Sequence, residues 1–381
     1  MSSHTAIIDE LTRAALRRDS TVLATVVRVT GSSYGGVGSR MLVRVDGSTV
    51  GLVSGGCLES DLAEHAKRVS STGRAEVVSY DTRNDEDAPW GLGLGCNGLI
   101  EVLLEPLNSV DAEKMAHLLE VAVTRAEPAV IATVIRVSES TAAGVEVGSH
   151  ALLLDENKPI STGSWGEILI EVLSKRDDAL SAGRKGFITA IGGAEISFEV
   201  VQPGVRLVVC GSGPDARPIA AFGAELGWDV TVVDHRPLTQ SHTARFPRAK
   251  VAYCEDALCL VRTVSITPRT AAVVVSHHFE RDRNYLESLL ASDASYIGML
   301  GPRARTERML GDLAARGVKR GDGDARLYAP VGMDIGGDGP DAIALSIIAE
   351  VSAIMSKRTA MHLRDKRGPL HAVAATAAST P

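Results

Sequence analysis

Cys57 is the residue of this sequence best placed to do chemistry, because it follows two glycines in the segment GLVSGGCLESDLAEHAKRV (residues 51–69). The apolar spacing from Leu58 to Val69 predicts a helix. Cys57 would then lie at the helix N-terminus, where unpaired backbone amides and the positive end of the helix dipole favour an anion and stabilise a thiolate. The segment therefore predicts a reactive or metal-binding thiol.

The three residues before this thiol, Ser54, Gly55 and Gly56, complete the candidate site. Because glycine has no Cβ, backbone amides here can approach a ligand closely, and we expect them to hold an anionic group. Glu59 follows in the first helical turn, where its charge partly opposes a thiolate. The alternative is a buried structural cysteine in a tight strand-to-helix turn.

A second thiol lies in the segment GLGLGCNG (residues 91–98), where Gly95 and Cys96 precede an expected strand at 99–104. Glycines just before a strand indicate close backbone approach or a bulge, and the alternative is an ordinary packing bend. Two thiols set among glycines favour a soft-ligand or anion-binding site. Zinc is disfavoured, because neither segment supplies a second Cys or His at ligand spacing.

A third glycine-rich stretch, GSSYGGVG (residues 31–38), is followed closely by Arg40. Its amides could cradle a phosphate or carboxylate, with Arg40 supplying positive charge. The alternative is a hairpin connection without a ligand.

The second half of the chain contains a relaxed dinucleotide fingerprint, G-x-G-x-x-A. An expected strand at 206–210 opens into Gly211 and Gly213, and a second strand at 228–233 ends in Asp234. This order of strand, glycines, helix, strand and acid predicts a Rossmann-type fold. Asp234 would either bind a ribose or cap the following loop.

Two prolines, Pro214 and Pro218, remove backbone amides near the expected phosphate position, which disfavours tight NAD binding. Three later loops carry His277, Arg303 and Asp334, each after an expected strand. In a doubly wound sheet these loops gather at the carboxyl edge, where ligands bind. A lone histidine there is more often structural, but three such side chains at one edge favour a binding site.

The elements that must position these residues belong to a chain of 381 residues, which suits two domains. Lys and Arg number 40 against 47 Asp and Glu, and a net charge of −7 argues against nucleic-acid binding. Hydrophobic residues make up 45% of the chain, but the apolar runs are too short to span a membrane. Five cysteines without a C-x-x-C pair indicate no disulfide framework. We therefore expect a cytoplasmic protein.

The pattern of expected strands, loops and helices changes near Pro203 and Gly204. Residues 1–200 alternate β-branched runs with glycine-rich loops, and residues 205–356 alternate strands with helical stretches, the pattern of a parallel sheet. We expect two domains with these bounds, followed by a flexible tail at 357–381.

The first domain contains a degenerate internal repeat, because LATVVRV (residues 23–29) returns as IATVIRV (residues 131–137). Such a duplication predicts two halves that pack on one core. SGGCLE (residues 54–59) aligns with STGSWG (residues 161–166), so the thiol and double glycine occur only in the first copy, where we expect the chemistry. The expected fold class is α/β: an N-terminal α/β domain with a degenerate repeat, plus a C-terminal Rossmann-like doubly wound parallel sheet.

Taken together and in this order, five stretches resemble the XdhC/CoxI family, accessory proteins of molybdenum hydroxylases such as xanthine dehydrogenase. The stretches are VSGGCLESDLAEHA, GLGLGCNGLIEVLLEPL, VVCGSGPDARPIAAFGAELGWDVTVVDHRP, SHHFERDRNYLESLLASDASYIGMLGPRAR and APVGMDIGGDGPDAIALSIIAEV. The resemblance implies a protein, commonly a dimer, that binds the molybdenum cofactor (molybdopterin, with or without a nucleotide extension). It further implies that the protein supports cofactor sulfuration and hands the cofactor to an apo molybdenum hydroxylase, with a cysteine desulfurase as the other partner.

The resemblance also assigns residues by position. The matching residues are Cys57 and Cys96 for the family's two thiols, Glu59 for their acidic neighbour, Gly211, Gly213 and Asp234 for the nucleotide fold, and His277, Arg303, Arg305 and Asp334 for its later loops. We expect Cys57 to contact the molybdenum end of the cofactor or to relay sulfur. The sequence departs from the family pattern where Tyr34 and Gly35 replace Pro-Arg and where Pro214 replaces His.

The alternative function is that of an NAD(P)-dependent oxidoreductase acting on a small molecule. The fingerprint and Asp234 favour it, but only His277 and His278 offer an acid or base for hydride transfer. A third interpretation makes the Rossmann domain a dimerisation scaffold without a ligand.

Overall fold

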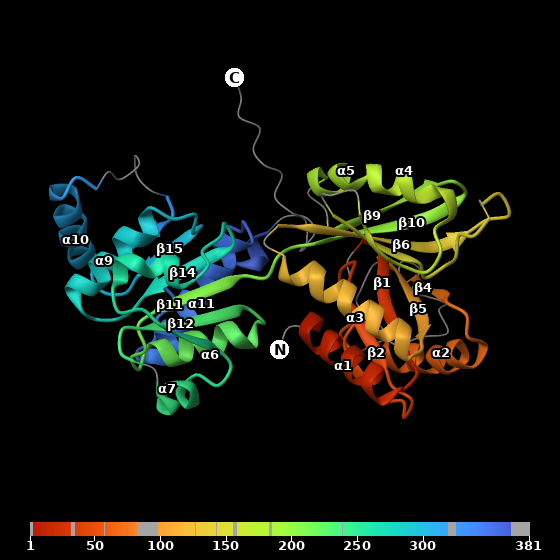
Figure 1. Cartoon of the computed structure of the whole chain (residues 1–381), viewed down its shortest axis with the longest axis horizontal. Helices are drawn as coiled ribbons and strands as arrows, with labels where there is room; N and C mark the ends of the chain where they lie inside the picture. The colour runs from red at the N-terminus through yellow and green to blue at the C-terminus, as the bar shows by residue number, and fades with distance from the viewer. Residues whose placement is uncertain are drawn as a thin grey trace, which may run out of the picture. The chain divides into compact units, whose positions relative to one another are not determined.

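The computed structural model describes residues 3–31, 35–56, 58–81, 98–125, 127–141, 143–154, 158–182, 185–237, 239–318 and 325–366. They form two compact units, one made mainly of residues 3–203 and the other of residues 204–365 (Figure 1). Among the described residues, no helix combines the length and the apolar character needed to cross a bilayer.

The N-terminal unit contains one sheet topology twice. The first copy comprises α1 (Ser3–Arg17), β1 (Thr21–Gly31), β2 (Arg40–Val43), β3 (Thr49–Gly51), α2 (Glu59–Thr72), β4 (Glu76–Asp81) and β5 (Gly98–Leu107). The second comprises α3 (Ser109–Thr124), β6 (Ala129–Val137), β7 (His150–Leu153), β8 (Ile160–Thr162), a 3-10 turn (Gly166–Ile168), α4 (Leu169–Ser174), α5 (Arg176–Ser181), β9 (Gly186–Ile191) and β10 (Ala194–Val201). The two antiparallel sheets have the equivalent orders β3-β2-β1-β5-β4 and β8-β7-β6-β10-β9, which confirms the internal repeat.

Strand register corrects one detail of the expected repeat. Gly51 and Ser161 are equivalent, because each pairs with the corresponding residue of the preceding strand. Ser54 therefore corresponds to Ser164, three residues beyond the Ser161 that the sequence alignment paired with it. In this register the position of the first-copy thiol corresponds to Glu167.

Equivalent residues from the two copies meet in one core, as the duplication predicts. The shared core lies beneath α1 and α3 and joins Leu23, Leu42 and Leu107 to their counterparts Ile131, Leu152 and Val201. Separate cores lie on the other faces of the sheets, beneath α2 for the first sheet and beneath α4 and α5 for the second (Figure 1). Residues 21–27 of β1 are all buried because alternate side chains enter different cores.

The C-terminal unit is a doubly wound parallel sheet, as expected. Its strands are β11 (Arg206–Cys210), β12 (Asp229–Asp234), β13 (Lys250–Tyr253), β14 (Thr270–Val274), β15 (Tyr296–Met299) and β16 (Leu327–Tyr328). Its helices are α6 (Ala216–Glu225), α7 (Gln240–Arg245), α8 (Leu260–Thr263), α9 (Phe279–Leu290), α10 (Arg303–Ala315) and α11 (Pro340–Met355), with 3-10 turns at Ala257–Cys259 and Leu363–Asp365.

The strand order is β13-β12-β11-β14-β15-β16, with all neighbours parallel. Helices α6 and α11 pack on one face of the sheet and α8, α9 and α10 on the other. The order reverses between β11 and β14, so the loops after these two strands flank the topological switch point where doubly wound folds bind ligands.

Candidate functional site

The loop that leads from β3 into α2 is held closed by the Glu59 carboxylate. Oε1 of Glu59 accepts hydrogen bonds from the backbone amides of Ser54 at 2.8 Å and Val53 at 3.3 Å. Oε2 accepts from the Ser54 hydroxyl at 2.6 Å and from the Leu58 amide at 3.2 Å. Glu59 therefore clamps both ends of the glycine loop to the first turn of α2.

Glu59 is held in its ionised form by these contacts. Burial alone would raise its pKa, but the hydrogen bonds from the Ser54 hydroxyl and from the backbone amides of Ser54, Glu59 and Val53 outweigh burial and lower the pKa. The donors that surround the carboxylate also offset its negative charge. This reduces the repulsion that the sequence led us to expect between Glu59 and a neighbouring thiolate.

The clamped loop has a buried base and an open tip. Ser54 is 5% exposed, whereas Gly55 and Gly56 are exposed. Gly56 has a φ of +104°, and a Cβ there would meet no atom within 4 Å, so its backbone conformation rather than crowding calls for glycine. An exposed glycine pair before a helix suits a ligand bound through backbone amides.

Cys57, Gly95 and Cys96 lie outside the described residues. Their assignment to a common site stays a prediction.

Arg40 lies inside the N-terminal unit, where it is 4% exposed. Its guanidinium forms a bidentate ion pair with Glu199 of the second copy and donates a hydrogen bond to the Gly38 carbonyl at 2.9 Å. Burial would raise the pKa of Glu199, but Arg40 outweighs burial and lowers it. A Cβ at Gly38 would collide with the Glu199 carboxylate, so this glycine makes room for the pair. These contacts favour a structural role for Arg40 over the expected ligand-binding one.

The two fingerprint glycines of the C-terminal unit have different surroundings. Gly211 has a φ of +128°, and a Cβ there would lie 2.8 Å from the backbone of Ser276. A Cβ at Gly213 would meet no atom within 4 Å. Gly211 therefore allows the chain after β11 to pack against the chain after β14, whereas Gly213 leaves space beside the start of α6 for a ligand.

This difference gives a matched pair of variants. Gly211→Ala is expected to lower the free energy of unfolding of the C-terminal unit by about 2–3 kcal/mol, because the added methyl both strains the backbone and overlaps Ser276. Gly213→Ala is expected to change it by less than about 0.5 kcal/mol. Urea denaturation followed by circular dichroism measures both, and equal effects would contradict the different roles.

Asp234 is bound on both carboxylate oxygens by groups of the protein. Oδ1 accepts from the Arg236 amide at 2.9 Å, and Oδ2 accepts from the Ser212 hydroxyl and from Arg236 Nη2. Arg245 donates to the Ser212 carbonyl at 3.1 Å. Burial would raise the pKa of Asp234, but Arg236 and Ser212 hold it well below its usual range. This arrangement matches the loop-capping alternative for Asp234.

His277 lies at the switch point in a left-handed backbone conformation, with a φ of +60°. Its Nε2 lies 2.7 Å from Oδ2 of Asp215, which directly precedes α6, so the contact joins the loops after β11 and β14. Non-glycine residues in this conformation are uncommon and cluster at functional sites. The His277 side chain is 57% exposed and therefore open to a ligand.

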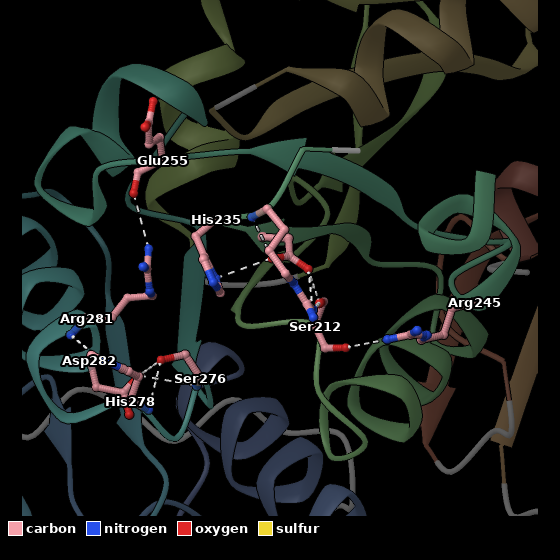
Figure 2. Close-up of polar contacts among 10 residues, drawn as sticks. Ser212, His235, Arg245, Glu255, Ser276, His278, Arg281 and Asp282 are labelled. Carbon is pink, nitrogen blue, oxygen red and sulfur yellow. Dashed lines mark hydrogen bonds and ion pairs between the residues drawn. The ribbon is translucent and has the colours of Figure 1, made fainter. Parts of the chain in front are cut away.

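A buried carboxylate fixes the loop that carries His277. Asp282 is 1% exposed and accepts hydrogen bonds from the Ser276 amide and hydroxyl (Figure 2). Arg305 Nη2 donates to the other oxygen of Asp282 at 2.7 Å. Arg305 therefore helps to hold the loop that carries His277 in place, through its contact with Asp282.

Arg303 and Asp334 are both exposed, at the start of α10 and in the loop before α11. These positions lie after β15 and β16, as the sequence predicts. Within the described residues, no hydrogen bond or ion pair links Arg303, Asp334 and His277 to one another.

Sequence reasoning missed several polar residues of this edge. Arg236 follows Asp234 by two positions, and this spacing beside an expected strand end could have signalled the pair. Asp282 and Arg245 lie within helix-forming stretches and carried no comparable signal.

Of the three cysteines that the structure describes, Cys259 is partly exposed and the other two are packing residues. Cys210 and Cys254 are buried in the C-terminal unit, and burial raises the pKa of both. Among the described residues, no three His, Cys, Asp or Glu side chains are arranged to hold a metal ion.

Comparison with known proteins relates both units to one family. The XdhC Rossmann domain matches residues 207–351, and the XdhC and CoxI family matches residues 14–81. The chain is 30% identical to a probable xanthine dehydrogenase subunit of Bacillus subtilis, over 88% of this chain and 93% of that protein. It is 24% identical to the molybdenum cofactor insertion chaperone PaoD of Escherichia coli, over 92% of this chain and 88% of that protein.

A solved structure agrees in fold as well as in sequence. The crystal structure described as a xanthine dehydrogenase from Bacillus halodurans superposes with a TM-score of 0.73 at 30% identity. The match covers 94% of this chain and 97% of that one. With two sequence regions and nearly the whole architecture in agreement, the chain belongs to the XdhC and CoxI family.

Proposed function

We propose that this chain binds the molybdenum cofactor as cargo, supports its sulfuration and inserts it into an apo molybdenum hydroxylase of the xanthine dehydrogenase type. The proposal draws support from the Bacillus subtilis relative, whose name links it to xanthine dehydrogenase, and from the Escherichia coli relative, which is named for cofactor insertion. The sulfur would come from a cysteine desulfurase. The chain would act in the cytoplasm as a homodimer.

The observation that carries the proposal is the loop clamped by Glu59. Molybdopterin is an anionic dithiolene with a phosphate, so it needs hydrogen-bond donors for the phosphate and soft groups near the metal. Glu59 already accepts hydrogen bonds from amides at both ends of the loop, so the exposed Gly55 and Gly56 between them would supply the amides for the anion, beside the N-terminus of α2. Cys57 would supply the soft group at the same position.

The carboxyl edge of the C-terminal unit supports a role for a nucleotide or phosphate. The space at Gly213 and the positive charge of Arg245 beside Ser212 suit an anionic group, whereas the charge of Arg236 is matched by Asp234. A nucleotide-extended cofactor would carry such a group.

A transfer assay tests this function. Wild-type protein loaded with cofactor is mixed with apo-hydroxylase, and the recovered hydroxylase activity is followed over time. We expect the Cys57→Ser variant to transfer at least about 10-fold more slowly, the size of effect seen when groups around a metal are changed. Normal transfer by this variant would remove the thiol from the mechanism, and failure of the wild-type protein to bind or transfer cofactor would refute the proposed function.

The alternative oxidoreductase is favoured by the strand order of the C-terminal unit. It is disfavoured by Asp234, whose oxygens already bind Ser212 and Arg236 instead of standing free for a ribose. Titration calorimetry with NAD, NADP and cytidine or guanosine nucleotides separates the two. We expect no NAD-dependent turnover; micromolar NAD binding with turnover would favour the enzyme, and a silent titration would favour a scaffold role.

A further inference from the structure

The internal repeat places two buried acid–base pairs at equivalent positions. In the first sheet Arg40 lies opposite Thr25, and in the second His150 lies opposite the equivalent Thr133. Each side chain reaches a glutamate of the other copy: Arg40 pairs with Glu199 and His150 with Glu105. These glutamates are also counterparts, because they lie opposite the equivalent residues Ile131 and Leu23.

The two pairs differ in how many oxygens of the carboxylate have a hydrogen-bond partner. The Arg40 guanidinium donates to both oxygens of Glu199. His150 offers one ring nitrogen, Nε2, at 2.6 Å from Oε1 of Glu105, because its Nδ1 lies 3.0 Å from Thr133 Oγ1. The other oxygen of Glu105, Oε2, is buried without a hydrogen-bond partner, and the residue is 3% exposed. A buried carboxylate oxygen left unpaired is costly.

A cavity of about 250 Å³ lies beside this second pair. Glu105 and His150 line it, together with Asp111, Glu146 and Thr162. All of the lining residues are described, and none of them is a lysine or arginine. Lys114, outside the lining, lies 3.8 Å from Asp111, so Glu105 and Glu146 carry most of the unopposed negative charge. Since no described group of His, Cys, Asp and Glu side chains suits a metal ion, the acidic lining favours an organic cation.

We propose that this cavity binds a guanidinium group from outside the fold. The group would donate to Oε2 of Glu105, as one nitrogen of Arg40 donates to Glu199 in the first copy. A charge-assisted hydrogen bond to a buried carboxylate is among the stronger polar contacts in proteins. The second copy thus has the carboxylate but no arginine, and the Glu105 carboxylate would turn to bring the buried Oε2 to the cavity when the group binds.

Titration calorimetry of the full chain with methylguanidinium tests the proposal, with methylurea as the neutral control of similar shape at matched ionic strength. Methylguanidinium should bind and methylurea should not. Equal binding of the two, or no binding of methylguanidinium, would overturn the proposal.

Two variants test the geometry. Glu105→Gln keeps the shape and removes the charge, and should weaken methylguanidinium binding by roughly 10-fold or more. His150→Arg restores the first-copy arrangement, so it should abolish binding and raise the melting temperature by about 2–4 °C. Glu167→Gln changes an exposed carboxylate outside the cavity and should leave binding unchanged. Unchanged affinity in Glu105→Gln, or a His150→Arg protein that melts below the wild type, would contradict the assignment.

The source of the group is distinguished by a second ligand, N-acetyl-arginine amide, which presents guanidinium as a protein side chain does. Binding as tight as that of methylguanidinium would identify a partner's arginine as the natural occupant. Binding of methylguanidinium alone would identify a small free guanidinium compound. Either result supports the chemistry of the cavity and is independent of cofactor binding by the glycine loop.

Discussion

Replacing Arg40 with methionine is expected to lower the free energy of unfolding of the N-terminal unit by about 3–5 kcal/mol, the range for a buried pair that loses one partner. The change leaves the Glu199 carboxylate, which is 8% exposed, without the guanidinium that binds both of its oxygens. Urea denaturation followed by circular dichroism measures the difference at neutral pH.

The deficit of the Arg40→Met protein should depend on pH. Arg40 lowers the pKa of Glu199 against the opposing effect of burial. The stability that the pair contributes is therefore present above the ordinary glutamate pKa of about 4.3 and is lost as the pH falls through the lowered value. Acidification should bring the wild type and the variant closer together.

Two controls separate the charge from the packing. Arg40→Met combined with Glu199→Leu removes both charges and should recover most of the lost stability. Lys67→Met breaks an exposed ion pair with Glu64 and should change stability by less than about 1 kcal/mol. If Arg40→Met lowers the free energy of unfolding no more than Lys67→Met does, the Arg40–Glu199 pair does not stabilise the fold.

Replacing Glu59 with glutamine is expected to reduce cofactor retention by about 10-fold or more while the fold persists. The amide nitrogen of glutamine cannot accept the hydrogen bonds that the Ser54 hydroxyl and the Leu58 amide donate to Oε2. The loop would then lose the clamp that presents Gly55 and Gly56. Pterin fluorescence after gel filtration of loaded protein measures retention.

The matched control for this variant is Glu64→Gln, an exposed position of the same helix whose carboxylate pairs with Lys67. It should retain cofactor as the wild type does. Full retention by Glu59→Gln would show that the clamp does not organise the site.

Local patterns were enough to predict much of the fold. The strand at 206–210 has the same bounds as β11, and the expected helix after Cys57 corresponds to α2. Both elements follow from apolar periodicity and glycine placement, which act within a few residues. The repeat and the doubly wound sheet followed from the same local signals, read along the chain.

The partners of the candidate site residues could not be predicted in this way. Arg40 meets Glu199 at a separation of 159 residues, and nothing in the local sequence of either residue indicates the other. The repeat could have suggested such pairs only with the correct register, which depends on strand pairing rather than on the similarity of the loops. The sequence alone indicates only that Glu59 opposes a thiolate. Its contacts with Ser54 and Leu58 form only once the loop turns back on the helix, and no local pattern predicts that turn.

The most direct test of the central claim is the molybdenum and pterin content of the wild-type and Cys57→Ser proteins, isolated from a molybdenum-sufficient host and again after reconstitution. If the glycine loop binds a metal-bearing anion through its thiol, the wild type carries equimolar molybdenum and pterin, and the variant carries much less of both. Wild-type protein that contains neither after reconstitution would contradict the account.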